Sequence, residues 1–91
     1  MPRNNLAWMI AVEPELQKPE LLDLALSEAT KAVQLSPTDG NFIDTLAAAY
    51  AARRDFASAL KWEQSEHGNK DAQRIAVYKE GAKTPAELGW K

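Results

Sequence analysis

The residues that could do chemistry are few and widely spaced in this chain of 91 residues. His67 is the one histidine, and no second histidine stands three or four positions away to complete a metal site on a helix face. Glu13, Glu15 and Glu20 could hold a cation, but their spacing matches no calcium loop and no glycine stands at the required turn. We therefore expect a capping or surface role for His67 and a solvated connector around the three glutamates.

Composition argues against further kinds of chemistry. The chain has no cysteine, which excludes thiolate catalysis and thiolate metal sites. Its four glycines are isolated from one another, which argues against a glycine-rich loop that cradles phosphate. The sequence therefore predicts a protein that is not an enzyme, with no cofactor and no bound metal.

Charge and hydropathy narrow the choice of partners. The 11 basic and 13 acidic side chains give a net charge of −2, so the chain lacks the basic field of a nucleic-acid-binding protein. No apolar run approaches the roughly 20 residues that span a bilayer, and the start lacks the pattern of a secretory signal. We expect no nucleic acid and no membrane insertion. The missing signal favours the cytoplasm, but a cysteine-free chain suits either side of a membrane, which leaves the compartment open.

Apolar residues recur at helical spacing nearly throughout the chain. One stripe follows Pro19, a typical first-turn proline, and another, rich in alanine, runs from Phe42 to Ala51. The first stripe consists of Leu22, Ala25, Leu26, Ala29, Ala32 and Val33. No segment alternates as a strand does. The sequence predicts an all-α fold of about five helical pieces, with a first helix over residues 4–12 and a polar connector over residues 13–18.

Polar residues and glycines mark where the later helices begin and end. We expect Ser36 to cap the helix that begins after it, and Asp55 to cap the next helix. We expect the helix after Asp55 to reach His67 and to end at Gly68 in the left-handed conformation that glycine adopts freely. Gly81 is expected to close the last long helix.

Two helical segments match each other at an offset of 34 residues, from position 22 to position 56. The matching positions are Leu22, Ala25 and Leu26 in the first segment and Phe56, Ala59 and Leu60 in the second. This offset is the period of a two-helix repeat. A stack of such repeats presents a surface for holding another molecule, so the period predicts binding or scaffolding.

Large, small, aromatic and turn positions of one known family occur in order along the chain. They are filled by Leu46, Ala47, Tyr50, Asp55, Phe56 and Ala59, and in the preceding repeat by Leu22, Ala25, Ala32 and Pro37. Over roughly residues 4–80 the chain resembles the divergent bacterial branch of the tetratricopeptide repeat family. The resemblance implies an α-α superhelix in a single domain over residues 1–91. Its expected parts are a first repeat over 4–36 with an insertion near 13–18, a second repeat over 37–68, a capping helix over 69–81 and a tail over 82–91.

The resemblance also implies a concave groove, lined by the first helix of each pair, that holds a peptide or protein segment. The residues expected to face that segment are Asn4, Asn5, Trp8, Asn41, Asp44, Thr45 and Ala48. Asparagine side chains can both donate to and accept from an extended backbone, and Asp44 favours a neutral or basic ligand. The basic cluster with which the family's best-known members grip a carboxylate has no counterpart at these positions.

Two other functions remain open. About three repeats are usually needed before such a stack is stable alone, and only about two are visible in this sequence. A second copy of the chain could complete the stack as a homodimer, through Leu6, Trp8, Ile10 and Trp90. Alternatively, the sequence is the C-terminal part of a longer repeat scaffold, in which preceding repeats cover the same end.

Overall fold

The computed structural model describes residues 3–70 and 72–81, and within these ranges all side chains except those of residues 3–6 and 14. The described residues form five α-helices and one short 3-10 helix, and none of them lies in a β-strand. The elements are α1 (Arg3–Val12), η1 (Pro14–Leu16), α2 (Pro19–Leu35), α3 (Gly40–Ala52), α4 (Phe56–Glu63) and α5 (Ala72–Glu80). The predicted all-α fold is confirmed, and the expected connector over residues 13–18 contains η1.

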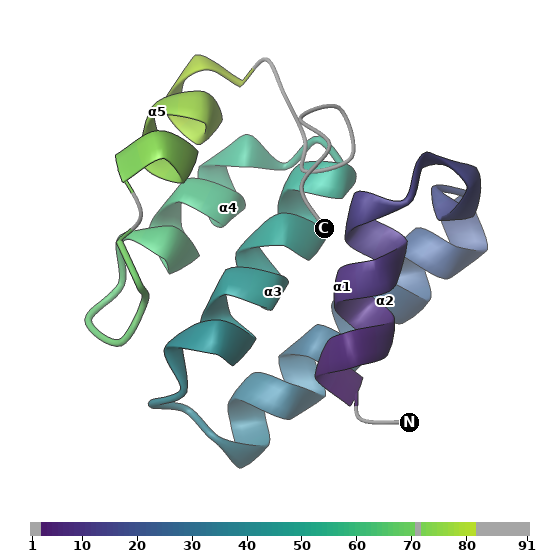
Figure 1. The fold of residues 1–91 in the computed structure, drawn as a ribbon, viewed down its shortest axis with the longest axis horizontal. Helices are drawn as coiled ribbons and strands as arrows, with labels where there is room; N and C mark the ends of the chain where they lie inside the picture. The colour runs from purple at the N-terminus through teal and green to yellow at the C-terminus, as the bar shows by residue number, and fades with distance from the viewer. Residues whose placement is uncertain (1–2, 71, 82–91) are drawn as a thin grey trace.

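The helices are arranged in two layers, and α3 packs against helices of both layers (Figure 1). Helix α1 packs on α2 and α3, α2 also packs on α3, and α4 packs on α3 and α5. In the view of Figure 1, α1, α3 and α5 lie nearer to the reader, and α2 and α4 lie behind them. The first and third helices therefore lie side by side on one face of the molecule.

Helix α3 is buried on most of its circumference because its alanines leave room for neighbouring helices. Its buried residues are Ile43, Thr45, Leu46, Ala47, Ala48, Ala49, Ala51 and Ala52. Alanine is also the best helix former, so the same residues favour the helix and allow close approach of its neighbours. Ile43 and Leu46 are both 2% exposed, and burial of each side chain stabilises the fold by about 1.5–3 kcal/mol.

Two parts of the core lie toward opposite ends of the molecule, and a smaller third part, formed by Ala11, Ala48 and Ala52, lies between α1 and α3. Ala7 and Ile10 of α1 pack with residues of α2 and α3 in the first part. In the second part, alanines of α3 and α4 surround Tyr78, which is the buried residue of α5. Trp62 of α4 is half-buried and packs against the first and second parts, so it joins them.

Three of the expected helix boundaries are confirmed. Pro19 stands in the first turn of α2, where its missing N–H costs nothing because no intrahelical acceptor is available there. Asp55 caps α4, and its carboxylate accepts hydrogen bonds from the backbone N–H and the hydroxyl of Ser58. Gly81 follows α5 with φ of +66°, the left-handed conformation that favours glycine.

The start of α3 differs from the prediction, because Asp39 caps this helix and Ser36 does not. Oδ1 of Asp39 accepts from the backbone N–H of Asn41 at 2.9 Å and of Phe42 at 3.4 Å. The backbone N–H of Ser36 donates to the carbonyl of Ala32, which makes Ser36 the C-terminal cap of α2. The prediction failed because both residue types can cap, and the extra residues form a turn between the two helices.

The end of α4 is also corrected. The helix stops at Glu63, short of His67, and Gly68 does not have a positive φ. A Cβ atom on Gly68 would lie 2.6 Å from the carbonyl oxygen of Trp62 and 2.7 Å from that of Glu63. Glycine is therefore needed here for the close approach of the loop to the helix end, and the left-handed residue of this loop is Lys70, with φ of 54°.

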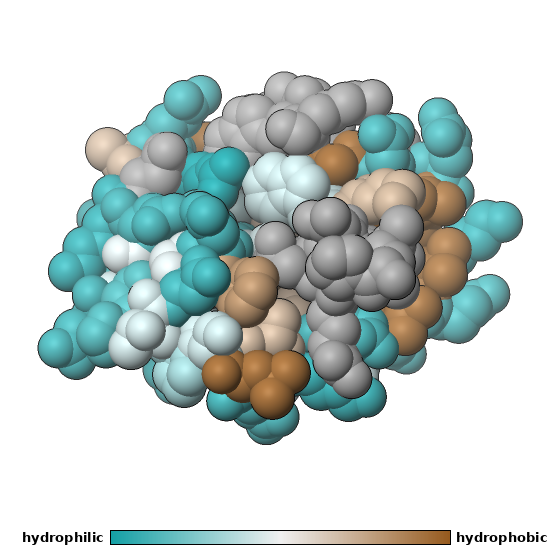
Figure 2. Space-filling view, turned by 60° about the horizontal axis from the view of Figure 1, so that its bottom comes forward, coloured by the Kyte–Doolittle hydropathy of each residue, from teal (hydrophilic) through white to brown (hydrophobic). Residues whose placement is uncertain are grey.

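Apolar side chains remain exposed at the α1–α2 end. Met9 of α1 is 36% exposed and Leu24 of α2 is 38% exposed, while Leu35, at the last turn of α2, is 72% exposed. Figure 2 shows hydrophobic atoms gathered at the right of the view, on the side where α1 and α2 lie in Figure 1. Of the helices that the structure describes, none has the length and apolar character required to cross a membrane.

Candidate functional site

The first turns of α3 position the candidate residues of that helix. Because Asp39 caps α3, Asn41 lies in its first turn, exposed, and Asp44 follows three residues later, close to the same face. The carbonyl oxygen of Asn41 accepts a hydrogen bond of 3.0 Å from Oγ1 of Thr45. The Thr45 hydroxyl is thus turned back onto its own helix.

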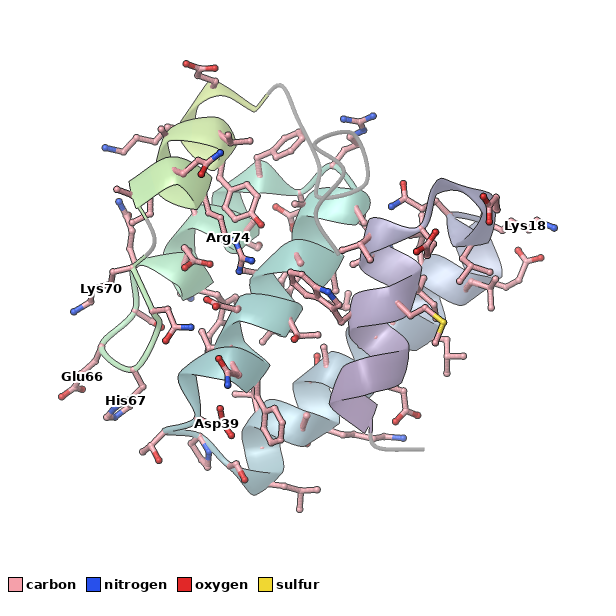
Figure 3. All side chains as sticks on the ribbon, viewed as in Figure 1. Lys18, Asp39, Glu66, His67, Lys70 and Arg74 are labelled. Carbon is pink, nitrogen blue, oxygen red and sulfur yellow. The ribbon has the colours of Figure 1, made fainter. Side chains whose placement is uncertain are left out.

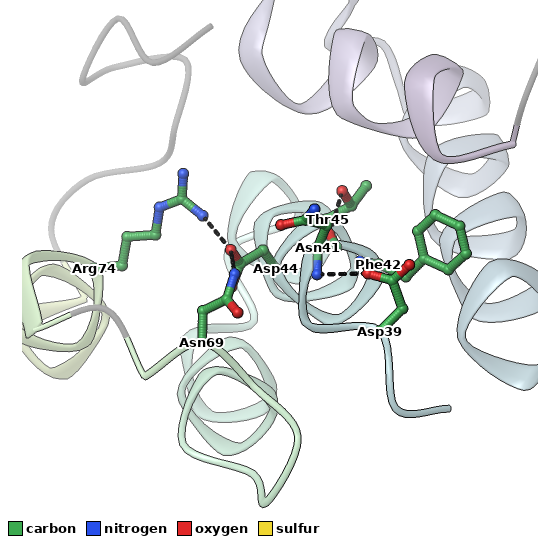
Figure 4. Close-up of polar contacts among 7 residues, drawn as sticks. All are labelled: Asp39, Asn41, Phe42, Asp44, Thr45, Asn69 and Arg74. Carbon is green, nitrogen blue, oxygen red and sulfur yellow. Dashed lines mark hydrogen bonds and ion pairs between the residues drawn. The ribbon is translucent and has the colours of Figure 1, made fainter. Parts of the chain in front are cut away.

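Asp44 is the centre of the polar contacts on this face (Figure 4). Its side chain is only 13% exposed, and its Oδ2 lies 3.2 Å from Nη1 of Arg74. The same oxygen accepts a hydrogen bond from Nδ2 of Asn69. The other oxygen, Oδ1, is buried and accepts no hydrogen bond from the part of the chain that the structure describes. Asn69 belongs to the loop after α4 and Arg74 to α5, so Asp44 connects both to α3.

Arg74 extends this cluster to α1. Its guanidinium carbon Cζ lies 5.1 Å from the centroid of the Trp8 ring, which is cation–π contact. Figure 3 shows Arg74 between α5 and α3, away from the outer loop that carries His67. We call the four residues Trp8, Asp44, Asn69 and Arg74 the Asp44 site.

The Asp44 site has the chemistry of a cation-binding site. A carboxylate with little access to water attracts a positive charge more strongly than an exposed one, because water screens it less. The face of an indole ring adds a second attraction, since its π-system is negative there. In this structure Arg74, a side chain of the same molecule, supplies the cation.

The structure brings together two residues that the sequence proposed for ligand contact. Trp8 of α1 and Asp44 of α3 both contact the Arg74 guanidinium, although 36 positions separate them in the chain (44 minus 8). Asn41 is exposed nearby on α3. These three residues remain candidates for ligand contact.

Three other candidates need correction because they are buried. Thr45 is 2% exposed and Ala48 is 0% exposed, since α1 covers this part of α3, where Ala48 packs with Ala11 and Trp8. Neither side chain has surface to offer a peptide in this conformation. Ile10, expected at a homodimer interface, is 1% exposed in the core between α1, α2 and α3.

The side chains of the remaining candidates lie outside the described part of the chain. Asn4, Asn5 and Leu6 belong to α1, but their side chains lie outside the described part of the chain. Trp90, the fourth self-association candidate, lies outside the described residues.

Sequence reasoning missed Asn69 and Arg74 as members of the site. A signal for Arg74 was present, because it stands four positions before Tyr78 and therefore lies on the inward face of α5. Asn69 carried no such signal. It reaches Asp44 only because the loop after α4 folds back on the helix end, with the backbone N–H of Lys70 donating to the carbonyl of Glu63.

A separate hollow of about 310 Å³ lies between the start of α2 and the end of α3, lined by Pro19, Leu22, Asp23 and Arg53. Asp23 and Arg53 form an ion pair with each other, and their side chains are 69% and 38% exposed. Their charges therefore compensate each other at this hollow. Across the described ranges, no group of three or more His, Asp or Glu side chains could hold a metal ion.

Comparisons with known proteins found no relative of this chain. No protein-family model, no curated protein and no solved structure matches the chain.

Proposed function

We propose that this chain is a non-enzymatic interaction module of the tetratricopeptide type, which holds a peptide or protein segment on the face shared by α1 and α3. The alternation of helices between two layers, with each helix packed on the next, supports this architecture. The offset of 34 residues between α2 and α4 supports it as well. In this proposal α1 and α2 form the first repeat, α3 and α4 the second, and α5 the cap.

The observation that carries the proposal is that Trp8 and Asp44, from two different helices, contact the same guanidinium at the Asp44 site. Aromatic and charged side chains that are partly accessible and come from adjacent helices are typical of the centre of a peptide-binding face. Asn41 lies exposed beside them, and its amide can pair with an extended backbone. None of these three side chains is among the fully buried residues of the core.

A selection of peptides tests this function. A phage-displayed library of random peptides would be selected on the wild-type protein, and the enriched peptides would then be measured on two variants. Asp44→Asn removes the charge of the site at nearly constant shape, whereas Asp23→Asn removes an exposed carboxylate on α2 and serves as the matched control. We expect enriched peptides to lose at least about tenfold in affinity on Asp44→Asn, since a hydrogen-bonded charge contact is worth about 1.5–3 kcal/mol. Failure to enrich any peptide, or equal binding by both variants, would contradict the proposal.

Self-association is the second candidate function, and the exposure of Met9 and Leu24 favours it. Exposed apolar side chains gathered at one end of a helical stack can be covered by another stack. A second copy of the chain would cover this end in a homodimer, and a preceding repeat would cover it in a longer scaffold.

Light scattering on the purified chain over a range of concentrations separates these functions. A homodimer predicts twice the monomer mass and a return to monomer in the variant Met9→Lys. Constant monomer mass would leave the peptide-binding function or the longer scaffold. A chain extended upstream would favour the scaffold if its thermal midpoint rises clearly above that of these 91 residues.

A further inference from the structure

We propose that Arg74 occupies the position of a ligand side chain, and that the segment bound by this protein presents an arginine which replaces Arg74 at Asp44 and Trp8. This inference rests on the proposed peptide-binding function and adds the chemistry of the ligand and an internal competitor. Its core observation is that the cation at the Asp44 site comes from α5, the helix at the C-terminal end of the described fold.

The contact between Arg74 and Asp44 leaves one acceptor of the carboxylate unused. Nη1 of Arg74 lies 3.2 Å from Oδ2, while Oδ1 is buried without a hydrogen bond from any described residue. A guanidinium that approaches a carboxylate along its fork donates to both oxygens, which is the stronger arrangement. An arginine that comes from a separate peptide is free of the constraint that α5 places on Arg74, so it can adopt this geometry.

The charges around the site select for a basic ligand. The described side chains of α1, from Ala7 to Val12, and all residues of α3, from Gly40 to Ala52, include no lysine or arginine. An acidic peptide would meet Asp44 without a compensating charge once Arg74 had moved. Arginine is favoured over lysine because its planar group can pair with the carboxylate and stack on the Trp8 ring at once.

Arg74 can leave the site without undocking of its helix. Tyr78 is the buried residue of α5, and it packs against alanines of α3 and α4 in the second part of the core. Arg74 reaches Asp44 and Trp8 with a long side chain, which is 20% exposed. Rotation of this side chain into water would open Asp44 while Tyr78 keeps α5 in place.

The effect of removing Arg74 on peptide affinity depends on whether Arg74 competes with the ligand or only supports the fold. If Arg74 blocks the site, its removal must strengthen the binding of an arginine peptide, because the open state then makes up a larger fraction of the protein. If Arg74 only supports the fold of the site, its removal must weaken binding or leave it unchanged. Tighter binding after removal of Arg74 is therefore expected only if Arg74 is a competitor.

The experiment is an NMR titration of the full chain with short capped peptides. The probes are three peptides with the same glycine and serine frame around a central arginine, glutamine or glutamate. We expect the arginine peptide to bind the wild type most tightly and to bind Arg74→Gln at least about fivefold more tightly than the wild type. Asp44→Asn should lose this binding, and binding to the wild type should weaken as salt rises. Arg54→Gln, a change at an exposed arginine, is the matched control and should bind the arginine peptide as tightly as the wild type does.

Several results would overturn the inference. One is equal or weaker binding of the arginine peptide by a folded Arg74→Gln variant, and another is tighter binding of the glutamine or glutamate peptide. If Arg74→Gln does not fold, the composition of peptides selected on the wild type decides, because a set without enriched arginine contradicts the inference. A selection that enriches peptides dependent on Asp44 but poor in arginine would refute this inference alone and leave the peptide-binding function standing.

Discussion

Replacement of Gly68 by alanine places a methyl group against two backbone carbonyls that have little freedom to move. The new Cβ would stand 2.6 Å from the carbonyl oxygen of Trp62 and 2.7 Å from that of Glu63, both in the last turn of α4. Both carbonyls already accept hydrogen bonds from the loop, the first from Ser65 and the second from Lys70. A side chain could rotate away, but these groups can move only if the loop or the helix end moves.

The expected magnitude is the difference between two effects. Alanine reduces the freedom of the unfolded chain, which stabilises a protein by about 0.4–1 kcal/mol where the folded conformation accepts it. Overpacking against atoms that cannot relax costs about 1–3 kcal/mol. We expect a net loss of about 1–2 kcal/mol for Gly68→Ala. In a domain of this size each kcal/mol lowers the thermal midpoint by roughly 4–8 °C, so the midpoint should fall by about 5–15 °C.

Thermal and urea unfolding followed by circular dichroism measures this loss. Glu66→Ala is the matched control, because Glu66 is exposed in the same loop and the variant should stay within about 0.5 kcal/mol of the wild type. The loop also carries Asn69 to Asp44, so Gly68→Ala should disturb the amide signal of Asn69 in an NMR spectrum. A variant as stable as the wild type, or more stable, would refute the argument that glycine is needed for the close approach.

Three further predictions concern stability and use the same unfolding assays. Asp55→Ala removes the cap of α4 and both hydrogen bonds to Ser58, and should cost about 1 kcal/mol; no loss would mean that the α4 cap does not depend on this carboxylate. Leu46→Ala leaves a cavity in the core beneath α1 and α2 and should cost about 2–5 kcal/mol, whereas a loss below 1 kcal/mol would show that the neighbouring helices collapse into the space. Asp23→Asn breaks an exposed ion pair with Arg53 and should change stability by less than about 1 kcal/mol, with a smaller effect in high salt. A larger loss would mean that the pair is less screened than its exposure indicates.

The α-helical class and most helix positions could be derived from the sequence because the responsible interactions are local. Apolar residues three and four positions apart define one face of a helix whatever the rest of the chain does. Pro19, Asp55 and Gly81 act on the backbone within one turn of themselves, and all three stand at the expected helix ends. Where two residues only three positions apart could both cap, as with Ser36 and Asp39, local reasoning could not choose between them.

Burial around α3 required the tertiary structure. The sequence predicts that Ala48 and Thr45 face the groove, because they lie on the first helix of a pair, within four positions of Asp44. Their burial depends on how closely α1 approaches α3, and this distance is set by the alanines on both helices acting together. Ile10 is covered for the same reason.

The composition of the Asp44 site was also decided at the tertiary level. Trp8 and Asp44 were proposed from the sequence through the resemblance to a repeat family, while the partners that hold Asp44 were not. Asn69 and Arg74 reach it because the loop after α4 turns back and α5 then docks through Tyr78. Spacing within the chain determined the helices and their faces, since those depend on neighbours within a few residues. Contacts between residues about 25–66 positions apart depend on packing of the whole chain, and only the folded structure brought Asn69, Arg74 and Trp8 to one carboxylate.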